Sequence, residues 1–366
     1  MNIGIVGCGN ISGIYLENLT RKFKNVTVAA VADLDEGRAR AKAEEYGIPR
    51  VMTLEEMLAD GGIDLILNIT TPLSHYSINK QALLAGKHVY VEKPLALNYA
   101  EGKELIELAE SKWLYVGCAP DTVLGAGIQT CCEQIKSGAI GRPVAGSAFM
   151  MCHGHEGWHP SPDFYYDYGG GPLFDMGPYY VTALVRMLGR AESVFAYGGR
   201  ASDTRVIGSE PRRGEVIPVK VDTHNAGVIR FANGAIVTLV TSFDVWNHWM
   251  PIMQIYGTEG SLNVPDPNNF GGDVKVATQE NMDFHDVELV SPYVENSRGI
   301  GVSELALALE EGRVNNASGR LGLHVLEIMD GFVRSSAEHR EIVLESSPSD
   351  PVPLDWSAPI GELRTK

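Results

Sequence analysis

The chain has 366 residues, which is too long for one ordinary domain and suits two. Its 46 acidic and 30 basic residues give a formal net charge of −16, which argues against non-specific nucleic-acid binding and against docking on anionic membranes. The five cysteines follow no disulfide or zinc spacing. We therefore expect a reduced, cytoplasmic protein that binds neither nucleic acid nor a membrane.

Short apolar runs and helical segments alternate through the first part of the chain. Strands are expected at 3–6, 26–32, 64–69, 87–91 and 114–117, and helices at 11–20, 36–46, 54–59, 74–85 and 99–111. Continuous apolar strands separated by helices are typical of a parallel, doubly wound sheet. This pattern predicts an α/β domain over residues 1–120.

The pattern changes after about residue 120. A helix at 128–137 precedes longer, alternating runs, which predict strands at 216–231, 235–243 and 252–256. Asn233-Gly234 between two of these runs indicates a hairpin. We expect a second α/β domain over 121–345, with a mostly antiparallel sheet, helices on one face and a last helix at 320–335. A polar, proline-rich tail at 346–366 follows.

The turn after the first strand, Gly7-Cys8-Gly9-Asn10-Ile11-Ser12, has the form that a dinucleotide pyrophosphate requires. Gly7 permits a tight turn, and Gly9 lets the backbone approach the phosphates. The helix that starts at Ile11 then points its amide groups at them. The alternative is a purely structural glycine turn, but the preceding strand and the following helix favour a cofactor.

Asp33 ends the second expected strand, where a carboxylate accepts hydrogen bonds from the adenosine ribose and repels a 2′-phosphate. No arginine adjoins it in the sequence, because the nearest, Arg38, lies inside the next helix. We therefore expect NAD rather than NADP as cofactor. As an alternative, Asp33 is a helix cap, a role that Asp35 could fill equally well.

Two later strands end in residues suited to a ligand site. Thr70-Thr71-Pro72 ends the strand at 64–69 and is followed by His75, and Glu92-Lys93-Pro94 ends the next strand. Ligands bind at the carboxyl ends of strands in open α/β sheets. A lysine there can donate a hydrogen bond to a reacting oxygen and stabilise its negative charge. The alternative is a solvated lysine with a glutamate partner.

With these motifs the chain resembles the glucose–fructose oxidoreductase/inositol dehydrogenase (Gfo/Idh/MocA) family. The matching segments are the glycine turn at 7–12, Thr71-Pro72 with His75, 86–94, 138–141 and the glycine-rich segment 169–177. The resemblance implies a Rossmann domain followed by an α/β domain with an open sheet. It also implies NAD(P)-dependent oxidation or reduction of sugars, cyclitols and related hydroxy compounds, and a homodimer or homotetramer.

The resemblance also suggests which groups are catalytic. The lysine of Glu-Lys-Pro and the aspartate of the glycine-rich segment are active-site groups in the family, and they fall on Lys93 and Asp175. The histidine that the family commonly has four residues further on is replaced by Tyr179. A tyrosine could act as acid/base if Lys93 lowered its pKa. A loop histidine, His155 above all, is the alternative.

The segment 152–160 is dense in flat, polar side chains, which suit a carbohydrate. The expected substrate contacts are His155, Trp158, His159 and Tyr180. Three histidines and a glutamate could instead bind a metal, but their spacing is irregular and the chemistry needs none, so we expect no metal. A third possibility is a loop that only packs on the rim of the cleft.

These observations predict an NAD-dependent oxidoreductase that transfers a hydride between nicotinamide and a secondary hydroxyl or carbonyl of a sugar, sugar derivative or cyclitol. The alternatives are an NAD-dependent glycosidase that works by transient oxidation, elimination, hydration and re-reduction, and a non-catalytic NAD-binding regulator. The expected cofactor contacts are Gly7, Gly9, Asn10, Ile11, Asp33, Thr70, Thr71, Pro72, His75, Glu92 and Lys93.

Overall fold

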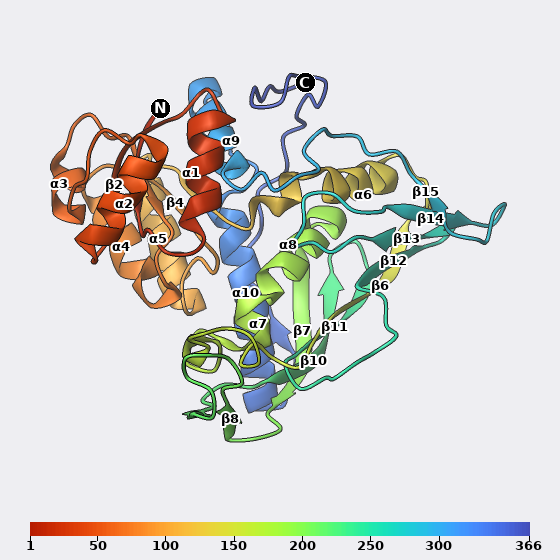
Figure 1. Ribbon diagram of the computed structural model, residues 1–366. Helices are drawn as coiled ribbons and strands as arrows, with labels where there is room; N and C mark the ends of the chain where they lie inside the picture. The colour runs from red at the N-terminus through yellow and green to blue at the C-terminus, as the bar shows by residue number, and fades with distance from the viewer.

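The computed structural model describes residues 1–366, and its first domain is built on a five-stranded sheet in the order β2-β1-β3-β4-β5 (Figure 1). Every pair in this sheet is parallel. The strands are β1 (Asn2–Val6), β2 (Thr27–Ala32), β3 (Leu65–Asn68), β4 (His88–Val91) and β5 (Val116–Cys118). The helices are α1 (Ser12–Arg21), α2 (Glu36–Tyr46), α3 (Leu54–Ala59), α4 (Pro72–Leu84) and α5 (Tyr99–Ser111). The expected doubly wound domain is confirmed.

Local signals in the sequence set the ends of these elements. Asp35 caps α2 by accepting a hydrogen bond from the Arg38 backbone N–H, and Gly47 ends that helix with a φ of 68°. Thr53 and Glu56 form a capping box at the start of α3. Helix α4 begins two residues before the expected start at 74, because proline is well suited to the first helical position.

The second domain contains a nine-stranded sheet in the order β15-β14-β13-β12-β6-β11-β10-β7-β16. Only the β11–β6 pair is parallel, so the expected, mostly antiparallel sheet is confirmed. The strands are β6 (Pro143–Met151), β7 (Ala191–Gly199), β10 (His224–Phe231), β11 (Ile236–Ser242), β12 (Met253–Gly257), β13 (Gly260–Val264), β14 (Lys275–Thr278), β15 (His285–Asp286) and β16 (Ile342–Val343). A separate ribbon pairs β8 (Thr204–Val206) with β9 (Val216–Pro218).

The helices of the second half are α6 (Ala126–Lys136), α7 (Gly171–Asp175), α8 (Gly177–Leu188), α9 (Ile300–Glu311) and α10 (Gly319–Glu338), with short 3-10 turns at Asp121–Leu124 and Asp163–Tyr165. All but α9 lie on one side of the large sheet, whereas α9 contacts β5 of the first domain (Figure 1). Helix α10 contacts both β7 and α5, so it joins the two domains. None of the helices has the combination of length and apolar character that a membrane span requires.

The two faces of the large sheet differ in burial. Ile229, Val237 and Leu239 are fully buried against the helices. On the opposite face, Tyr197, Val228 and Ile236 are 57%, 39% and 53% exposed. We call this opposite side the open face. It carries apolar side chains from β7, β10 and β11 that nothing in the chain covers.

One expected strand was wrong. The run 216–231 is divided into β9, which pairs with β8, and β10, which begins at His224. Pro218 lacks an N–H for a central sheet ladder, so the run cannot continue as one inner strand. The hairpin at Asn233-Gly234 is confirmed, because β10 and β11 are antiparallel and Gly234 has a φ of 88°.

The segment at 346–366 packs against both domains. The Gly361 N–H donates to the Tyr293 hydroxyl at 3.0 Å, and its carbonyl accepts from the Lys24 N–H at 3.4 Å. Lys24 also pairs with Glu362 at 2.9 Å. Leu354 is 4% exposed and belongs to the hydrophobic core of the protein, so the segment is packed and does not trail in solvent.

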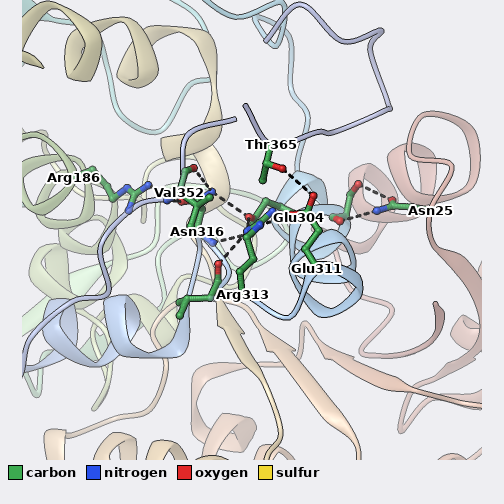
Figure 2. Close-up of polar contacts among 10 residues, drawn as sticks. Asn25, Arg186, Glu304, Glu311, Arg313, Asn316, Val352 and Thr365 are labelled. Atoms are coloured by element: carbon green, nitrogen blue, oxygen red, sulfur yellow. Dashed lines mark hydrogen bonds and ion pairs between the residues drawn. The ribbon is translucent and has the colours of Figure 1, made fainter. Parts of the chain in front are cut away.

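A buried carboxylate on α9 organises the contacts beneath this segment (Figure 2). Glu304 is fully buried; it pairs with Arg313 at 2.6 Å and accepts the Asn316 N–H at 2.7 Å. The Asn316 amide then donates to the Val352 carbonyl at 3.0 Å. Asn25 of the first domain forms two hydrogen bonds with Ser303, the residue that precedes Glu304. Helix α9 therefore holds the tail and the first domain together.

Candidate active site

The turn at 7–12 is shaped to receive a phosphate-bearing ligand. Gly7 has a φ of 103°, and a Cβ there would lie 2.8 Å from the Ile69 carbonyl oxygen, so glycine is required. A Cβ on Gly9 would meet nothing within 4 Å, and Gly9 and Asn10 are exposed. Helix α1 has no side-chain cap and no acidic residue in its first turn. Its free amide groups therefore fit a pyrophosphate, with Ile11 at the entry.

Asp33 lies at the end of β2 beside this turn. Its carboxylate accepts the Cys8 N–H at 2.7 Å and the Asp35 N–H at 2.9 Å. The sequence suggested that no arginine stands next to Asp33, and this was wrong: Arg38 Nη1 is 3.6 Å from Asp33 Oδ1. Because Arg38 is the third residue of α2, its long side chain reaches back over the helix start.

The loop after β3 is held by buried polar groups. Asn68 Oδ1 accepts the Thr70 hydroxyl at 2.7 Å, which leaves Thr71 and Pro72 at the exposed edge of the sheet. His75 is fully buried, with Nδ1 2.7 Å from the Pro94 carbonyl and Nε2 3.1 Å from the Thr70 carbonyl. Burial lowers the pKa of His75. Both ring nitrogens face backbone, so His75 supports the loop from below and has no nitrogen left for a cofactor.

Lys93 and Asp175 form the centre of the site. Lys93 Nζ donates to the Asp175 carbonyl at 2.8 Å and to Oδ1 at 3.0 Å, and each side chain is 17% exposed. Burial alone would raise the pKa of Asp175, but the Lys93 ammonium, together with His155, lowers it to about 2. Although burial opposes it, the Asp175 carboxylate raises the pKa of Lys93. The pair is therefore ionised.

Glu92 supports Lys93 from the cofactor side. Its Oε2 accepts the Lys93 backbone N–H at 3.0 Å, and its Oε1 accepts the Tyr15 hydroxyl at 2.7 Å. Tyr15 belongs to α1, so the carboxylate links Lys93 to this helix. Glu92 is 8% exposed, and its oxygens are occupied by protein groups.

The glycine-rich segment places Asp175. A Cβ on Gly170 would lie 2.3 Å from the Phe164 carbonyl oxygen, and Gly171 has a φ of 78°. This close packing lies at the start of the short helix α7, which ends at Asp175. Since the last carbonyls of a helix lack partners within it, the Asp175 carbonyl is free to accept Lys93.

Tyr179 lies beside the ion pair, in the first turn of α8. Its ring centroid is 5.4 Å from Lys93 Nζ, and it is 7% exposed. The expected lowering of the Tyr179 pKa by Lys93 is not found: burial raises this pKa, and the opposing effect of Lys93 only reduces the rise. Tyr180, expected to contact substrate, is 5% exposed and lies near Asp266, and burial raises its pKa.

The loop after β6, which carries His155, Trp158, His159 and Tyr165, brings His155 close to Asp175. His155 Nε2 is 3.5 Å from Asp175 Oδ2, and its ring lies 4.4 Å from Tyr165 and 5.3 Å from Trp158. Trp158 is 63% exposed. The His159 ring lies 5.4 Å from Tyr165, and burial lowers the pKa of His159.

Glu156 has a structural role. It is 7% exposed, accepts Arg205 Nη1 at 3.1 Å and also accepts the Tyr166 hydroxyl. Arg205 pairs with Asp244 as well. The glutamate within the histidine-rich segment therefore anchors the loop. No group of three or more His, Cys, Asp or Glu side chains is arranged to hold a metal ion.

The sequence did not single out the role of Tyr15. Its hydroxyl reaches Glu92 across a separation of 77 residues in the chain. No local motif signals such contacts. Tyr165 could be found only as part of the aromatic segment that follows the histidines.

Comparison with known proteins identifies both domains. Residues 1–118 match the oxidoreductase family with an NAD-binding Rossmann fold, and residues 128–263 match the GFO/IDH/MocA C-terminal domain. The myo-inositol 2-dehydrogenase of Thermotoga maritima is 25% identical over 264 residues, 72% of this chain and 74% of the relative. The 1,5-anhydro-D-fructose reductase of Ensifer adhaerens is 27% identical, over 71% of this chain and 74% of its own.

Other matches are partial in sequence or concern the fold alone. An uncharacterised oxidoreductase of Schizosaccharomyces pombe is 30% identical over 161 residues, 43% of this chain and 42% of the relative. An NAD-binding oxidoreductase from Klebsiella pneumoniae has a TM-score of 0.83 at 20% identity, covering 95% of this chain and 99% of its own. Levoglucosan dehydrogenase in complex with NADH has a TM-score of 0.82 at 21% identity, covering 94% and 99%. The chain therefore belongs to the Gfo/Idh/MocA family of oxidoreductases and carries that family's NAD-binding Rossmann domain.

Proposed function

We propose that the protein transfers a hydride between NAD and a secondary hydroxyl or carbonyl group of a sugar, sugar derivative or cyclitol. The observation that carries this proposal is the Lys93–Asp175 ion pair with Tyr179 beside it, at the carboxyl end of β4. The names of the inositol dehydrogenase and anhydrofructose reductase relatives support the substrate class.

Lys93, Asp175 and Tyr179 each have a separate role in this reaction. Bound NAD supplies the hydride acceptor or donor at its nicotinamide ring. Lys93 donates a hydrogen bond to the reacting substrate oxygen and stabilises the negative charge that develops there. Asp175 holds the ammonium in place through two contacts, at 2.8 and 3.0 Å. Tyr179 accepts the hydroxyl proton in oxidation and returns it in reduction.

The loop around His155 forms the substrate side of the site. Trp158 and Tyr165 present flat faces, which pack against the C–H groups of a sugar ring, and His155 and His159 add polar edges. Since the substrate must reach Lys93, this side of the cleft selects for ring-shaped polyhydroxy compounds.

A second candidate function is glycoside hydrolysis through transient oxidation. The contact between His155 Nε2 and Asp175 Oδ2 at 3.5 Å favours it, because elimination and hydration require an acid/base group in addition to Tyr179. Net NADH formation from a free sugar supports the dehydrogenase. Release of an aglycone without net NADH supports the glycosidase.

One screen tests both functions. Free sugars, sugar acids, cyclitols and aryl glycosides are incubated with NAD, and both NADH absorbance and aglycone release are followed. Lys93→Ala should lose the activity found, and Lys103→Ala, on an exposed part of α5, is the matched control. An activity that survives in Lys93→Ala would contradict the proposed site.

We also propose that the protein is a homodimer or homotetramer assembled through the open face. Tyr197, Val228 and Ile236 lie there on three neighbouring strands and are between 39% and 57% exposed. Contiguous apolar surface of this kind is typical of interfaces between copies of a chain.

A further inference from the structure

A cavity adjoins the loop after β6 and is lined by none of the proposed catalytic groups. Its volume is about 440 Å³, within the range that small-molecule sites occupy. Three parts of the chain line it: the loop itself, the segment 201–206 that contains β8, and Asp244 and Trp246, which follow β11. The second domain therefore holds a space large enough for a ligand beside the Lys93–Asp175 ion pair and distinct from it.

A buried cluster of charged groups forms one wall of this cavity. The Arg205 side chain is 9% exposed; its Nη1 donates to Glu156 at 3.1 Å, and its Nη2 pairs with Asp244 and donates to the Phe243 carbonyl at 3.2 Å. Asp244 Oδ2 also accepts the Thr223 hydroxyl at 2.6 Å. These bonds fix the cluster, but the Arg205 Nε–H has no partner within the protein. Because buried donors are normally paired, we expect an acceptor from outside the chain here.

The charges and donors of this wall favour a neutral ligand that carries hydroxyl groups. Two carboxylates outnumber one guanidinium, and the chain has a formal net charge of −16, so an anion is disfavoured. A guanidinium only donates hydrogen bonds and a carboxylate only accepts them, whereas a hydroxyl group does both. Ser202 and Thr204 add two hydroxyls of the protein to the same lining. A polyhydroxy compound therefore matches the cavity better than a phosphate or a carboxylate does.

An exposed tryptophan supplies an apolar surface to the same cavity. The Trp246 ring stacks on His153, with the ring centroids 3.3 Å apart and the planes inclined by 15°. One face of the indole is therefore covered, yet Trp246 is 82% exposed. Exposed apolar surface beside a cavity is typical of ligand sites, and an aromatic face packs against the C–H groups of a sugar ring. With the polar wall, Trp246 gives the cavity the chemistry of a sugar site.

The cavity is a close neighbour of the proposed active site. His155 Nε2 is 3.5 Å from Asp175 Oδ2, and the next residue in the chain, Glu156, lines the cavity. Phe243 contacts both sides: its ring centroid is 4.7 Å from that of His155, and its carbonyl accepts Arg205 Nη2. This adjacency suits two linked rings of one substrate molecule.

We propose that the cavity is a subsite for a second, neutral sugar ring, which stacks on Trp246 while the oxidised ring lies at Lys93. The substrate is then a disaccharide or another glycoside. Hydroxyl groups of the second ring accept the Arg205 Nε–H and donate to Glu156 or Asp244. No bond is made or broken in the subsite, so it acts on substrate affinity. This inference rests on the proposed function, because it names the substrate class of the same reaction.

Binding measurements test the subsite without relying on turnover. The full-length protein with NADH is titrated in a calorimeter with glucose and with four disaccharides: cellobiose, maltose, lactose and sucrose. We expect at least one disaccharide to bind on the order of tenfold more tightly than glucose, since an aromatic anchor is added. Trp246→Ala should abolish this advantage. Trp249→Ala should keep it, because Trp249 is 97% exposed in the same loop but does not line the cavity.

Two results of this titration would overturn the inference. One is that none of the four disaccharides binds more tightly than glucose, and the other is that the advantage survives Trp246→Ala. Ala201→Trp guards against misfolding of Trp246→Ala, since Ala201 is an exposed residue of the lining and a large side chain there fills the cavity. It should bring the affinity ratio of disaccharide to glucose close to one. A ratio that Ala201→Trp leaves unchanged would also count against the subsite.

Kinetics with NAD separate this inference from the proposed function. The disaccharide that binds more tightly should show a KM on the order of tenfold lower than that of glucose, with a similar kcat. If glucose is oxidised and no disaccharide has a lower KM, only the present inference fails. If a disaccharide binds through Trp246 and none of the sugars reduces NAD, the proposed hydride transfer fails while the subsite stands.

Discussion

Lys93 contacts Asp175 through both the side chain and the main chain of the aspartate, at 3.0 and 2.8 Å. The lysine lies just after β4 of the first domain, and the aspartate ends α7 of the second domain. The ion pair therefore crosses the boundary between the domains. Its geometry depends on how the domains meet as well as on either loop alone.

Lys93→Ala should lower turnover on the order of 10²–10³-fold, because one donor to the developing charge is lost. From the sequence alone, Lys93 could be a solvated side chain with little effect on stability. At 17% exposure, however, its removal leaves the Asp175 carboxylate buried without its partner. We therefore expect a measurable loss in the free energy of unfolding, determined by urea titration.

The double variant Lys93→Ala/Asp175→Asn separates these two effects. Removing the stranded charge should restore part of the stability that Lys93→Ala loses, while turnover stays low. A double variant that is no more stable than Lys93→Ala would show that the two residues are not coupled in this way.

Tyr179→Phe should cost on the order of 10²–10⁴-fold in turnover, the range typical of a general acid/base. The ring is kept, so its packing beside Lys93 should persist and the thermal midpoint should change little. Turnover at saturating substrate is compared with that of His155→Gln. A mild effect of Tyr179→Phe together with a severe effect of His155→Gln would assign the acid/base role to His155 instead.

Asp33→Ala should weaken NAD binding roughly tenfold or more, because the hydrogen bonds of a charged acceptor are lost. We also expect the preference for NAD over NADP to narrow. Arg38, now 3.6 Å from Asp33, would become free to pair with a 2′-phosphate. Calorimetric titration with each cofactor measures the difference in affinity between NAD and NADP. Asp33→Ala/Arg38→Ala is the control, and it should bind NADP less well than Asp33→Ala does.

Asp121→Asn should change how stability depends on pH. Burial raises the pKa of Asp121 to about 6, above the ~3.9 of an unfolded aspartate. Below about pH 4 the group is protonated in both states, and its contribution to stability is complete. As the pH rises through about 6, this contribution to the free energy of unfolding, about 2–3 kcal/mol, is lost. Asparagine keeps an acceptor for the Gly299 and Gly301 N–H groups and does not titrate.

We therefore expect Asp121→Asn to be more stable than the unmodified protein near pH 7 and to differ less from it near pH 4. The measurement is urea unfolding at several pH values, with the difference between the two proteins plotted. A constant difference across this range would show that Asp121 does not carry the pH dependence.

Val228→Glu/Ile236→Glu should dissociate the assembly. Both side chains lie on the open face, so two charges would be buried in the proposed interface and cost little in a free monomer. Light scattering at micromolar concentration gives the mass. A monomeric unmodified protein would rule out the assembly, and a variant that keeps the oligomeric mass would place the interface elsewhere.

The first domain was predictable because its signals are local. Each strand is a continuous apolar run, and the turn at 7–12, the cap at Asp35 and the glycine at 47 mark the ends of helices. Lys93 was expected from its place after a strand, but Asp175 and Tyr179 could be placed beside it only by resemblance, since they come from the other domain. Chemistry alone would have left these two as polar residues among many.

What could not be predicted depends on long-range packing. Nothing near His75 in the sequence shows that both of its nitrogens face carbonyls at the ends of two strands. The contact of Arg38 with Asp33 depends on how α2 leaves β2. Pro218, within an apparently continuous run, was a readable signal for the break between β9 and β10. The alternation around it concealed this break.

The segment around Gly361 ties the two domains together. It is bonded to Lys24, just after α1, and to Tyr293, which follows β15 in the chain. The domains cannot separate at this point without breaking these bonds, whether or not NAD is bound. Hydrogen exchange should therefore find the Gly361 amide protected with and without NAD, while the amides around Thr71 change on binding.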